Sequence, residues 1–364
     1  MNPGDRVDGG YNVGVDRAEA DVDVLETDTY DVAEPGDAEG TSEITFDEEL
    51  PTVALISTGG TIASTVDYRT GAVTAQFDAE DVLRAVPELA GRANYRGRVV
   101  ANILSENMTP DVWVDLAEAI HEEIQRGADG VVVMHGTDTM QYTASALSFT
   151  LETPVPVVFT GSQRSADRPS SDNVMNAVCA VEAAAADHSE ADNVMNAVCA
   201  VEAAAADHSE VLVCMHADAS DEVCALHRGT RVRKNHTSRR DAFETVGAKP
   251  LGEVEWASGE VSFRRPVADR GAADLSLSAT LERDVELVKY VPGTGPEALD
   301  VADGAAGLVL EGTGLGHVDT GWIDRIEELI DDGTTVVVTS QCLEGRVCDR
   351  VYDTGRDLLA AGVV

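Results

Sequence analysis

Two threonine-containing motifs, each following a short apolar run, have the residue types for nucleophilic chemistry. TGGTIAS (58–64) follows the apolar run at 53–57, and HGTDTM (135–140) follows the run at 130–134. Glycines let the backbone approach a substrate closely, and a threonine hydroxyl can attack a carbonyl carbon once a base removes its proton. A tight turn followed by a helix N-cap is the alternative interpretation of either motif alone.

A threonine nucleophile needs a base, and few amines in this chain could supply one. The only lysines are Lys234, Lys249 and Lys289. A lysine amine is normally protonated at neutral pH, so it must be perturbed or oriented, and a neighbouring carboxylate can orient an amine that relays a proton. A set of threonine, lysine and aspartate meets this requirement.

The elements that must position these residues are predicted by short β-branched runs that alternate with helical patterns from residue 52 onward. We expect buried parallel strands at 53–57, 98–104, 130–135, 156–161 and 211–216. Thr109 and Pro110 open a predicted helix that runs through Gln125, with Thr109 as the N-cap. Strand followed by helix, repeated, predicts a doubly wound α/β domain with a parallel sheet, whose reactive residues gather at the carboxyl ends of the strands.

The chain divides into three predicted regions. Residues 1–50 are acidic and glycine-rich, which predicts a truncated amino-terminal module and a solvated linker. Residues 51–250 form the larger α/β domain. After a less regular stretch, strand patterns at 284–291, 305–312 and 334–342 and helices near 322–331 and 354–361 predict a smaller α/β domain over 281–364 that ends soon after its last strand.

A repeat interrupts the larger domain. Residues 172–190 recur without change at 192–210, within a duplicated stretch of 171–210. Twenty residues advance a helix by five turns and about 200°, so a continuous helix through both copies would point its second apolar stripe almost opposite to its first. We therefore expect one copy to occupy the helix position and the other to loop out, with a break near 188–191. A recent tandem duplication or a sequence artefact is the preferred origin.

The composition describes an acidic but globular chain. Asp and Glu number 66 against 26 Lys and Arg, the formal charge is −40, and 43% of residues are hydrophobic. This apolar fraction can form a large core, which excludes a disordered polyanion. Acidic residues spread along the whole chain, with so few lysines, predict a halophilic archaeal source. At molar salt the Debye length is roughly 3 Å, so the charge does not exclude a tRNA partner.

Neither a membrane segment nor a cysteine framework is expected. No apolar run approaches the roughly 18 residues of a membrane span, and the start lacks the pattern of a signal peptide, which predicts a cytoplasmic protein that does not bind membranes. The six cysteines include no CxxC pair. We expect buried free thiols and no metal site.

The same motifs carry a resemblance to a known family. TGGTIAS, HGTDTM and the intervening NILSENM (102–108) resemble the asparaginase/glutaminase amidohydrolases. DYRTGAV (67–73), GSQRSADRPSSD (161–172) and VRKNHTSRRDAFETV (232–246) more closely resemble the D subunits of archaeal glutamyl-tRNA(Gln) amidotransferases. The resemblance covers about residues 51–364, and it implies an asparaginase-like fold with 51–250 as its N-terminal domain.

The resemblance also implies the roles of individual residues. The implied site consists of Thr61 as the primary nucleophile, Thr137, Asp138 and Lys234 as the proton-handling cluster, Ser105 and Glu106 as ligands of the substrate's α-carboxylate and α-amine, and Tyr68 on the mobile loop. Which threonine attacks first stays open, and an ordinary exit from a strand is the alternative for Ser105 and Glu106. We expect His135 to be structural.

The function implied by the resemblance is hydrolysis of glutamine as part of a larger complex. The ammonia would pass to a partner, the E subunit of the amidotransferase, which would use ATP and Mg²⁺ to convert Glu-tRNA(Gln) to Gln-tRNA(Gln). No cofactor or metal is expected in this chain itself, and a homodimer is expected. Two alternatives remain, a free-standing L-asparaginase and an inactive relict, because the chain is duplicated inside its core and looks shortened at both ends.

Overall fold

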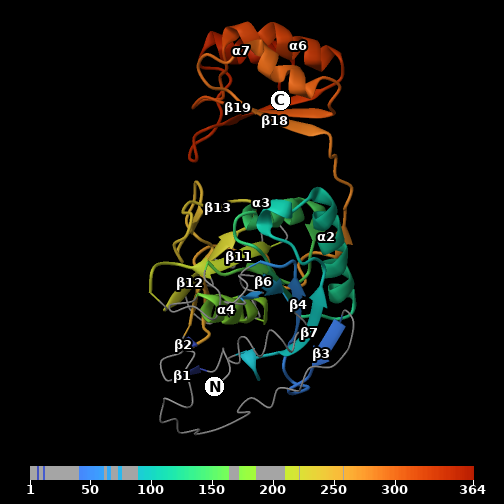
Figure 1. Ribbon diagram of the computed structural model, residues 1–364, viewed down its shortest axis with the longest axis vertical. Coiled ribbons are helices and arrows are strands. Elements are labelled where there is room, and N and C mark those ends of the chain that lie inside the picture. Colours follow the sequence, from blue (N-terminus) through green and yellow to red (C-terminus); the bar gives the residue numbers. More distant parts are fainter. Residues whose placement is uncertain are drawn as a thin grey trace. The chain divides into compact units, whose positions relative to one another are not determined.

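The computed structural model describes residues 6–7, 11–12, 41–60, 64–66, 73–75, 89–163, 172–185, 210–220, 222–256 and 258–364 (Figure 1). The chain separates into two compact units, Met1–Ala279 and Thr280–Val364. The division falls at the end of the stretch that the sequence predicts to be less regular, and the domain ranges drawn from the sequence stay predictions.

A nine-stranded mixed sheet forms the centre of the first unit, in the order β16-β15-β12-β11-β10-β8-β4-β7-β3. Five neighbouring strands are parallel: β11 (Val211–His216), β10 (Val157–Thr160), β8 (Gly130–Met134), β4 (Thr52–Ser57) and β7 (Asn94–Val99). The antiparallel strands at the edges are β3 (Thr41–Ile44), β12 (Val223–Arg228), β15 (Gly252–Glu255) and β16 (Val261–Phe263). The predicted parallel sheet is thus confirmed in its centre and extended by strands that the sequence did not predict.

Helices cover both faces of this sheet. The helices α2 (Pro110–Gln125) and α3 (Met140–Thr150) pack on one face and α4 (Asn173–Ala185) on the other. Successive side chains of a strand point to opposite faces, so Ala54 and Ile56 join the core under α2 and α3, whereas Val53 and Leu55 join the core under α4. Two separate apolar cores result, as the predicted doubly wound architecture requires.

The start of α2 agrees with its sequence signals. Thr109 has extended backbone angles and its hydroxyl accepts a hydrogen bond from Val112 N at 3.4 Å, while Pro110 occupies the first helical position. The predicted N-cap and both predicted ends of this helix are confirmed.

The predicted strand at 98–104 is wrong in position, because β7 spans Asn94–Val99. The apolar run led the prediction too far along the chain, and the strand instead contains Arg96 and Arg98. These arginines are accommodated because they form ion pairs with α2, Arg96 with Glu123 at 3.0 Å and Arg98 with Glu122 at 2.5 Å. The run after Val99 leaves the sheet at its carboxyl edge and reaches the site described below.

The first copy of the repeat forms α4. Its Asn176 is buried and donates through Nδ2 to Gly161 O at 2.8 Å and to Asp172 Oδ2 at 3.1 Å, which ties the helix to the end of β10. The predicted looping out of one copy, with a break near 188–191, lies outside the described residues.

The second unit contains a three-stranded parallel sheet, β18 (Val285–Lys289), β19 (Gly307–Gly312) and β20 (Thr335–Ser340), in that order. Its helices are α6 (Ile323–Asp331), α7 (Asp353–Ala361) and the 3₁₀ segments η4 (Pro296–Ala302) and η5 (Thr320–Trp322). Trp322 is fully buried and packs with Leu310, Ile326 and Leu358 in a separate core. All three strands and both helices predicted for this region are present.

Short antiparallel pairs complete the described structure. They are β1 (Arg6–Val7) with β2 (Tyr11–Asn12), β5 (Ser64–Val66) with β6 (Val73–Ala75), β9 (Leu151–Glu152) with β17 (Ser276–Leu277), and β13 (Val232–Lys234) with β14 (Phe243–Thr245). Within the described part of the chain, no helix is long and apolar enough to cross a membrane.

The cysteines follow the prediction in the first unit and depart from it in the second. Cys179, Cys214 and Cys224 are buried free thiols, as predicted. Cys342 is exposed and Cys348 is half-buried, so the prediction of buried thiols is wrong for these two. Both follow the end of β20 in the long connection to α7, where no core covers them. Cys199 lies outside the described residues.

Candidate active site

The two threonine motifs meet at the carboxyl ends of neighbouring strands. The first motif continues from β4 and the second from β8, and Thr58 N donates to Met134 O at 3.0 Å. A methyl group added to Gly60 would stand 2.6 Å from Gly136 N, so glycine is needed for this approach. Gly60 also has a φ of +93°, which other residues rarely adopt. Both motifs therefore lie at the carboxyl ends of strands, as predicted, and they are in close contact.

The predicted nucleophile and loop residue lie beyond what the structure describes. Thr61 follows Gly60 directly in the sequence, but Thr61 and Tyr68 are both outside the described residues. Their roles remain predictions.

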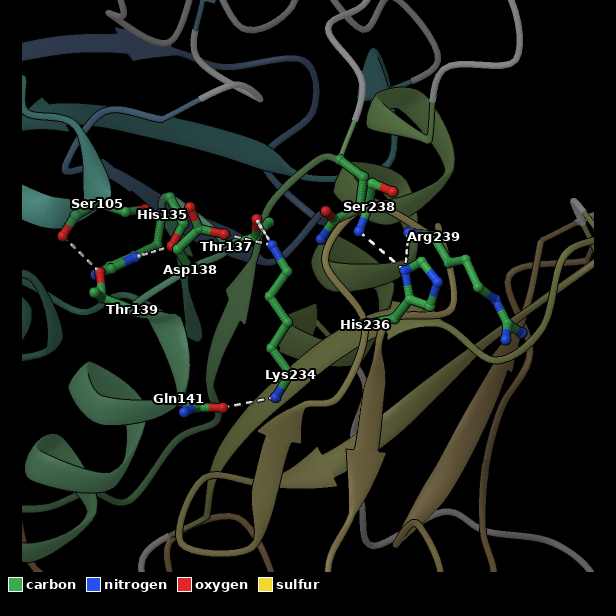
Figure 2. A network of polar contacts seen from close by, with 12 residues as sticks. Ser105, His135, Thr137, Asp138, Thr139, Gln141, Lys234, His236, Ser238 and Arg239 are labelled. Atoms are coloured by element: carbon green, nitrogen blue, oxygen red, sulfur yellow. Dashed lines mark hydrogen bonds and ion pairs between the residues drawn. The ribbon is translucent and has the colours of Figure 1, made fainter. Parts of the chain in front are cut away.

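Lys234 reaches the second motif from a distant part of the chain. Its Nζ donates to Thr137 Oγ1 at 2.9 Å and forms an ion pair with Asp138 Oδ1 at 2.5 Å (Figure 2). The lysine side chain is only 9% exposed, whereas that of Asp138 is 71% exposed. A carboxylate on the solvent side thus orients an amine that is otherwise shielded. The structure brings together the three residues of the predicted proton-handling cluster.

The hairpin of β13 and β14 carries Lys234 and is fixed to the sheet and to α3. Val232 and Phe243 are buried in the core beneath α3. Gln141 Oε1 accepts a hydrogen bond from Lys234 N at 2.6 Å. On the other strand, Thr245 Oγ1 is 2.8 Å from His227 Nδ1 of β12. Attachments on both of its strands therefore determine where the lysine lies.

Ser105 and Glu106 lie in a 3₁₀ turn, η3 (Ser105–Asn107), beside the second motif. Thr139 Oγ1 donates to Ser105 O at 3.0 Å. A methyl group added to Gly136 would stand 2.1 Å from Ser105 Oγ, so this hydroxyl packs directly against the backbone of the motif. Glu106 is exposed. Ser105 is thus next to the threonine cluster, while its role as a substrate ligand remains a prediction.

His135, the first residue of the second motif, is buried at the end of β8. Its ring packs against Phe159, and its Nδ1 is 2.7 Å from Gly136 O, which assigns the ring proton to Nδ1. Burial lowers the pKa of His135 to about 4, so the ring is neutral at pH 7. A neutral ring bonded to the backbone fits the structural role predicted from the sequence.

Two residues at the beginning of α3 were missed by the sequence analysis. Thr139 and Gln141 contact the turn of Ser105 and the backbone of Lys234, respectively. Their only signal in the sequence is that Thr139 lies within the second motif and Gln141 directly follows it, because the partners are 34 and 93 residues away.

The site contains a hydroxyl, an amine and a carboxylate, and the start of α3 lies beside them. Backbone N–H groups at a helix N-terminus favour developing negative charge. Across the described ranges, no group of three or more His, Cys, Asp or Glu side chains could hold a metal ion. The chemistry available from these side chains is acyl transfer by a hydroxyl nucleophile with proton relay.

In this doubly wound fold, two threonine motifs follow neighbouring parallel strands, and a lysine is bound to the second motif. These features define the asparaginase class of amidohydrolases. Residues 52–191 and 185–268 match the family Asparaginase, N-terminal, and residues 284–364 match the Glutaminase/Asparaginase C-terminal domain. The fold is similar to the thermostable L-asparaginase from Thermococcus kodakarensis, with a TM-score of 0.72 and 29% identity over 86% of this chain and 87% of that one. A probable cytoplasmic L-asparaginase from Campylobacter jejuni gives a TM-score of 0.67 and 27% identity over 86% and 89%.

Sequence relatives narrow the class further. A protein of Halobacterium salinarum is 66% identical over 99% of this chain and 82% of its own length, and one of Haloquadratum walsbyi is 60% identical over 99% and 83%. Both are named as the D subunit of glutamyl-tRNA(Gln) amidotransferase, and so is a protein of Methanosarcina mazei that is 53% identical over 86% and 70%. The chain belongs to this family of amidotransferase D subunits. Its relatives in halophilic archaea agree with the source predicted from composition.

The repeat is where the chain departs from the family pattern. The match to the N-terminal asparaginase domain is in two stretches that overlap at residues 185–191, inside the repeat. The second matched stretch, 185–268, includes Lys234. Thr137, Asp138 and Lys234 thus lie on both sides of the interruption and still meet in space.

Proposed function

We propose that this chain is the glutaminase subunit of a tRNA-dependent amidotransferase that converts Glu-tRNA(Gln) to Gln-tRNA(Gln). Lys234 provides the principal support, because its amine contacts both Thr137 and Asp138 at the carboxyl edge of the sheet. Such a cluster serves to move a proton to and from a hydroxyl nucleophile.

In the proposed reaction, the Thr61 hydroxyl attacks the side-chain amide carbon of glutamine. The hydroxyl proton passes to the cluster of Thr137, Lys234 and Asp138, which delivers a proton to the amide nitrogen as the carbon–nitrogen bond breaks. Ammonia leaves and an ester with Thr61 remains. Water then hydrolyses the ester to release glutamate, so one glutamine and one water give one glutamate and one ammonia. Thr137 as the first nucleophile remains the alternative.

Substrate recognition is proposed to rest on the turn beside the second motif. A glutamine carries a carboxylate and an ammonium group on its α-carbon, and the Ser105 hydroxyl and the Glu106 carboxylate are suitable partners for them. Tyr68 would close over the bound substrate. The location of Ser105 against Gly136 supports this arrangement, because it brings the proposed ligand next to the proton-handling cluster.

The ammonia is proposed to pass to a partner in the same complex, the E subunit, which would bind ATP and Mg²⁺ and amidate glutamate on the tRNA. The name shared by the relatives supports a complex of several subunits. A homodimer of this chain and a cytoplasmic location, where aminoacyl-tRNA is used, complete the proposal.

The test is ammonia release from glutamine and from asparagine at molar KCl, with and without the partner subunit and glutamyl-tRNA(Gln). We expect release from glutamine that rises when both are added. Thr61→Ala and Lys234→Ala should each abolish release without unfolding the protein, as checked by circular dichroism, while Lys249→Ala should retain it. Preference for asparagine without any partner would instead indicate a free-standing asparaginase. A folded complex without hydrolysis would indicate an inactive relict.

A further inference from the structure

The first turn of α3 makes two side-chain hydrogen bonds to segments that are far away in the sequence. Thr139 Oγ1 donates to the carbonyl oxygen of Ser105 at 3.0 Å, and Gln141 Oε1 accepts from the backbone N–H of Lys234 at 2.6 Å (Figure 2). One turn of helix is therefore bonded both to the proposed substrate-binding turn and to the hairpin that carries the lysine.

The backbone N–H of Lys234 is directed away from its own hairpin. On either side of it, Val246 N donates to Arg231 O and Asn235 N donates to Ala242 O across the strand pair. Hydrogen bonds in an antiparallel pair alternate along each strand, so the N–H of the intervening Lys234 points outward. Gln141 supplies the acceptor on that outer side, and this bond attaches the edge of the hairpin to α3.

Both ends of Lys234 are consequently held by one short segment. The backbone is bonded to Gln141, and Nζ is bonded to Thr137, four residues earlier in the chain. Loss of the Gln141 acceptor would free the backbone end of this arrangement. Because proton transfer requires donor and acceptor within about 3 Å, a small shift of the hairpin would lengthen the contact between Lys234 and Thr137.

Thr139 occupies the N-cap position of α3, yet its hydroxyl makes no capping hydrogen bond to the helix. The hydroxyl is instead donated to Ser105 O, at the first residue of η3. A threonine at this position usually stabilises its own helix. Its use on another segment indicates that the bond fixes the turn of Ser105 and Glu106.

We propose that Gln141 and Thr139 are positioning residues with separable effects: Gln141 holds Lys234 for proton transfer, and Thr139 holds the turn of Ser105 and Glu106 for substrate binding. This inference rests on the proposed function. Neither residue contacts the reacting atoms in the proposed mechanism.

The kinetic test uses glutamine hydrolysis by the complete complex with the partner subunit and tRNA. Gln141→Met removes the acceptor at similar length and should lower kcat about tenfold while KM stays within about twofold. Thr139→Val removes the donor at similar shape and should raise KM about tenfold with kcat nearly unchanged. Gln141→Glu and Thr139→Ser keep the required oxygen, so their kcat and KM should stay close to the wild-type values.

Matched controls make the same chemical changes elsewhere. Gln125→Met, at the exposed end of α2, and Thr339→Val, at an exposed position of β20, should leave kcat and KM unchanged. The proposed separate effects on kcat and KM would be overturned if Gln141→Met and Thr139→Val changed both constants to the same extent. Failure of the conservative variants to restore activity would overturn them as well.

A second measurement does not depend on activity. The chain has only three lysines, so acylation by an amine reagent can be followed at each of them by mass spectrometry. Lys249 and Lys289 are exposed and serve as internal standards for the shielded Lys234. Gln141→Met should increase labelling of Lys234 severalfold relative to the standards, and Thr139→Val should not.

The two measurements separate this inference from the proposed function. If the wild-type complex releases no ammonia but Gln141→Met increases the labelling of Lys234, the glutaminase assignment is wrong and the positioning of the lysine holds. If labelling is unchanged in a variant that remains folded by circular dichroism, the role of Gln141 is wrong whatever the activity.

Discussion

Gly136 packs so closely against Ser105 that a methyl group on its α-carbon would stand 2.1 Å from Ser105 Oγ. A methyl group on the α-carbon of Gly60 would likewise stand 2.6 Å from the backbone nitrogen of Gly136. The two threonine motifs and the turn of Ser105 are thus joined through positions that have no side chain. This packing explains why glycine precedes the threonine in each motif.

We expect Gly136→Ala to displace Ser105 and to raise KM for glutamine by about tenfold or more, because the new methyl group and the hydroxyl cannot occupy the same space. The crowding should also lower the free energy of unfolding by about 1–3 kcal/mol. Steady-state kinetics and thermal unfolding at molar KCl measure both effects. Gly314→Ala is a suitable control, because an added methyl group there meets its nearest neighbour at 3.8 Å. An unaltered KM in Gly136→Ala would argue against Ser105 as a substrate ligand.

Lys234→Met should lower kcat at least about a hundredfold, since proton relay by a positioned side chain contributes roughly that much or more. Asp138→Asn should have a smaller effect in the same direction, because it leaves the amine in contact with Thr137 but removes the charge that orients it. Single-turnover kinetics with glutamine measure this. Lys249→Met, at an exposed lysine, provides the comparison, and equal rates for Lys234→Met and Lys249→Met would disprove the relay.

Two adjacent glutamates on α2 should differ sharply in their effect on stability. Glu123 is 1% exposed and pairs with Arg96 at 3.0 Å and Arg126 at 2.6 Å. Glu123→Gln therefore leaves the guanidinium of Arg96, which is largely buried, without its counterion. We expect a loss of about 3 kcal/mol in the free energy of unfolding. Glu122→Gln removes an exposed partner of Arg98 and should have little effect. Denaturant unfolding at two KCl concentrations tests this, and similar losses for both variants would contradict it.

The buried histidine of β12 should make stability fall in mild acid. Burial lowers the pKa of His227 from 6.5 to about 4, so between these values the unfolded chain binds a proton that the folded protein does not. The contribution of His227 to the free energy of unfolding is therefore fully present above about pH 7 and is lost as the pH falls from 6.5 to 4. Below pH 4 this residue causes no further loss. At pH 5 the loss is about 2 kcal/mol.

The variant His227→Asn can retain a polar contact with Thr245 but cannot titrate. Between pH 7 and pH 5, the free energy of unfolding of this variant should fall by about 2 kcal/mol less than that of the wild type. Thermal or denaturant unfolding at both pH values gives the comparison. Identical pH dependence in the two proteins would mean that His227 is protonated in the fold.

Deletion of residues 191–210 should preserve the fold and the activity. The deletion leaves one intact copy of the repeat and shortens the connection between Ala185 of α4 and Val211 of β11 from 25 residues to five. Because the entropic cost of closing a connection grows with the logarithm of its length, the free energy of unfolding should rise by about 1.4 kcal/mol. Lower stability in the deletion variant would show that the second copy contributes contacts of its own.

The parallel strands, α2 and the smaller domain could be predicted because their signals are local. Runs such as 130–134 and 211–216 are apolar without interruption, since both faces of a central strand are buried. Thr109 and Pro110 mark the start of α2 through the backbone angles and hydrogen bonds of their own segment. The prediction misplaced the strand that contains Arg96 and Arg98 because its signal is not local. The carboxylates that let these arginines occupy a strand belong to α2, a separate segment of the chain.

By itself, the sequence determined the residue types available for catalysis and the family they resemble, because motif, spacing and composition are properties of the chain alone. The resemblance already implied Lys234 as the lysine of the second motif. Only the tertiary structure decided that its Nζ lies 2.9 Å from Thr137 Oγ1 across 97 residues, and which side chains at the start of α3 hold Lys234 and Ser105 in position. Such contacts depend on how the hairpin, the turn and the helix pack around a common sheet edge. Hydrogen bonds act over about 3 Å, and no local pattern encodes which distant residues will approach that closely.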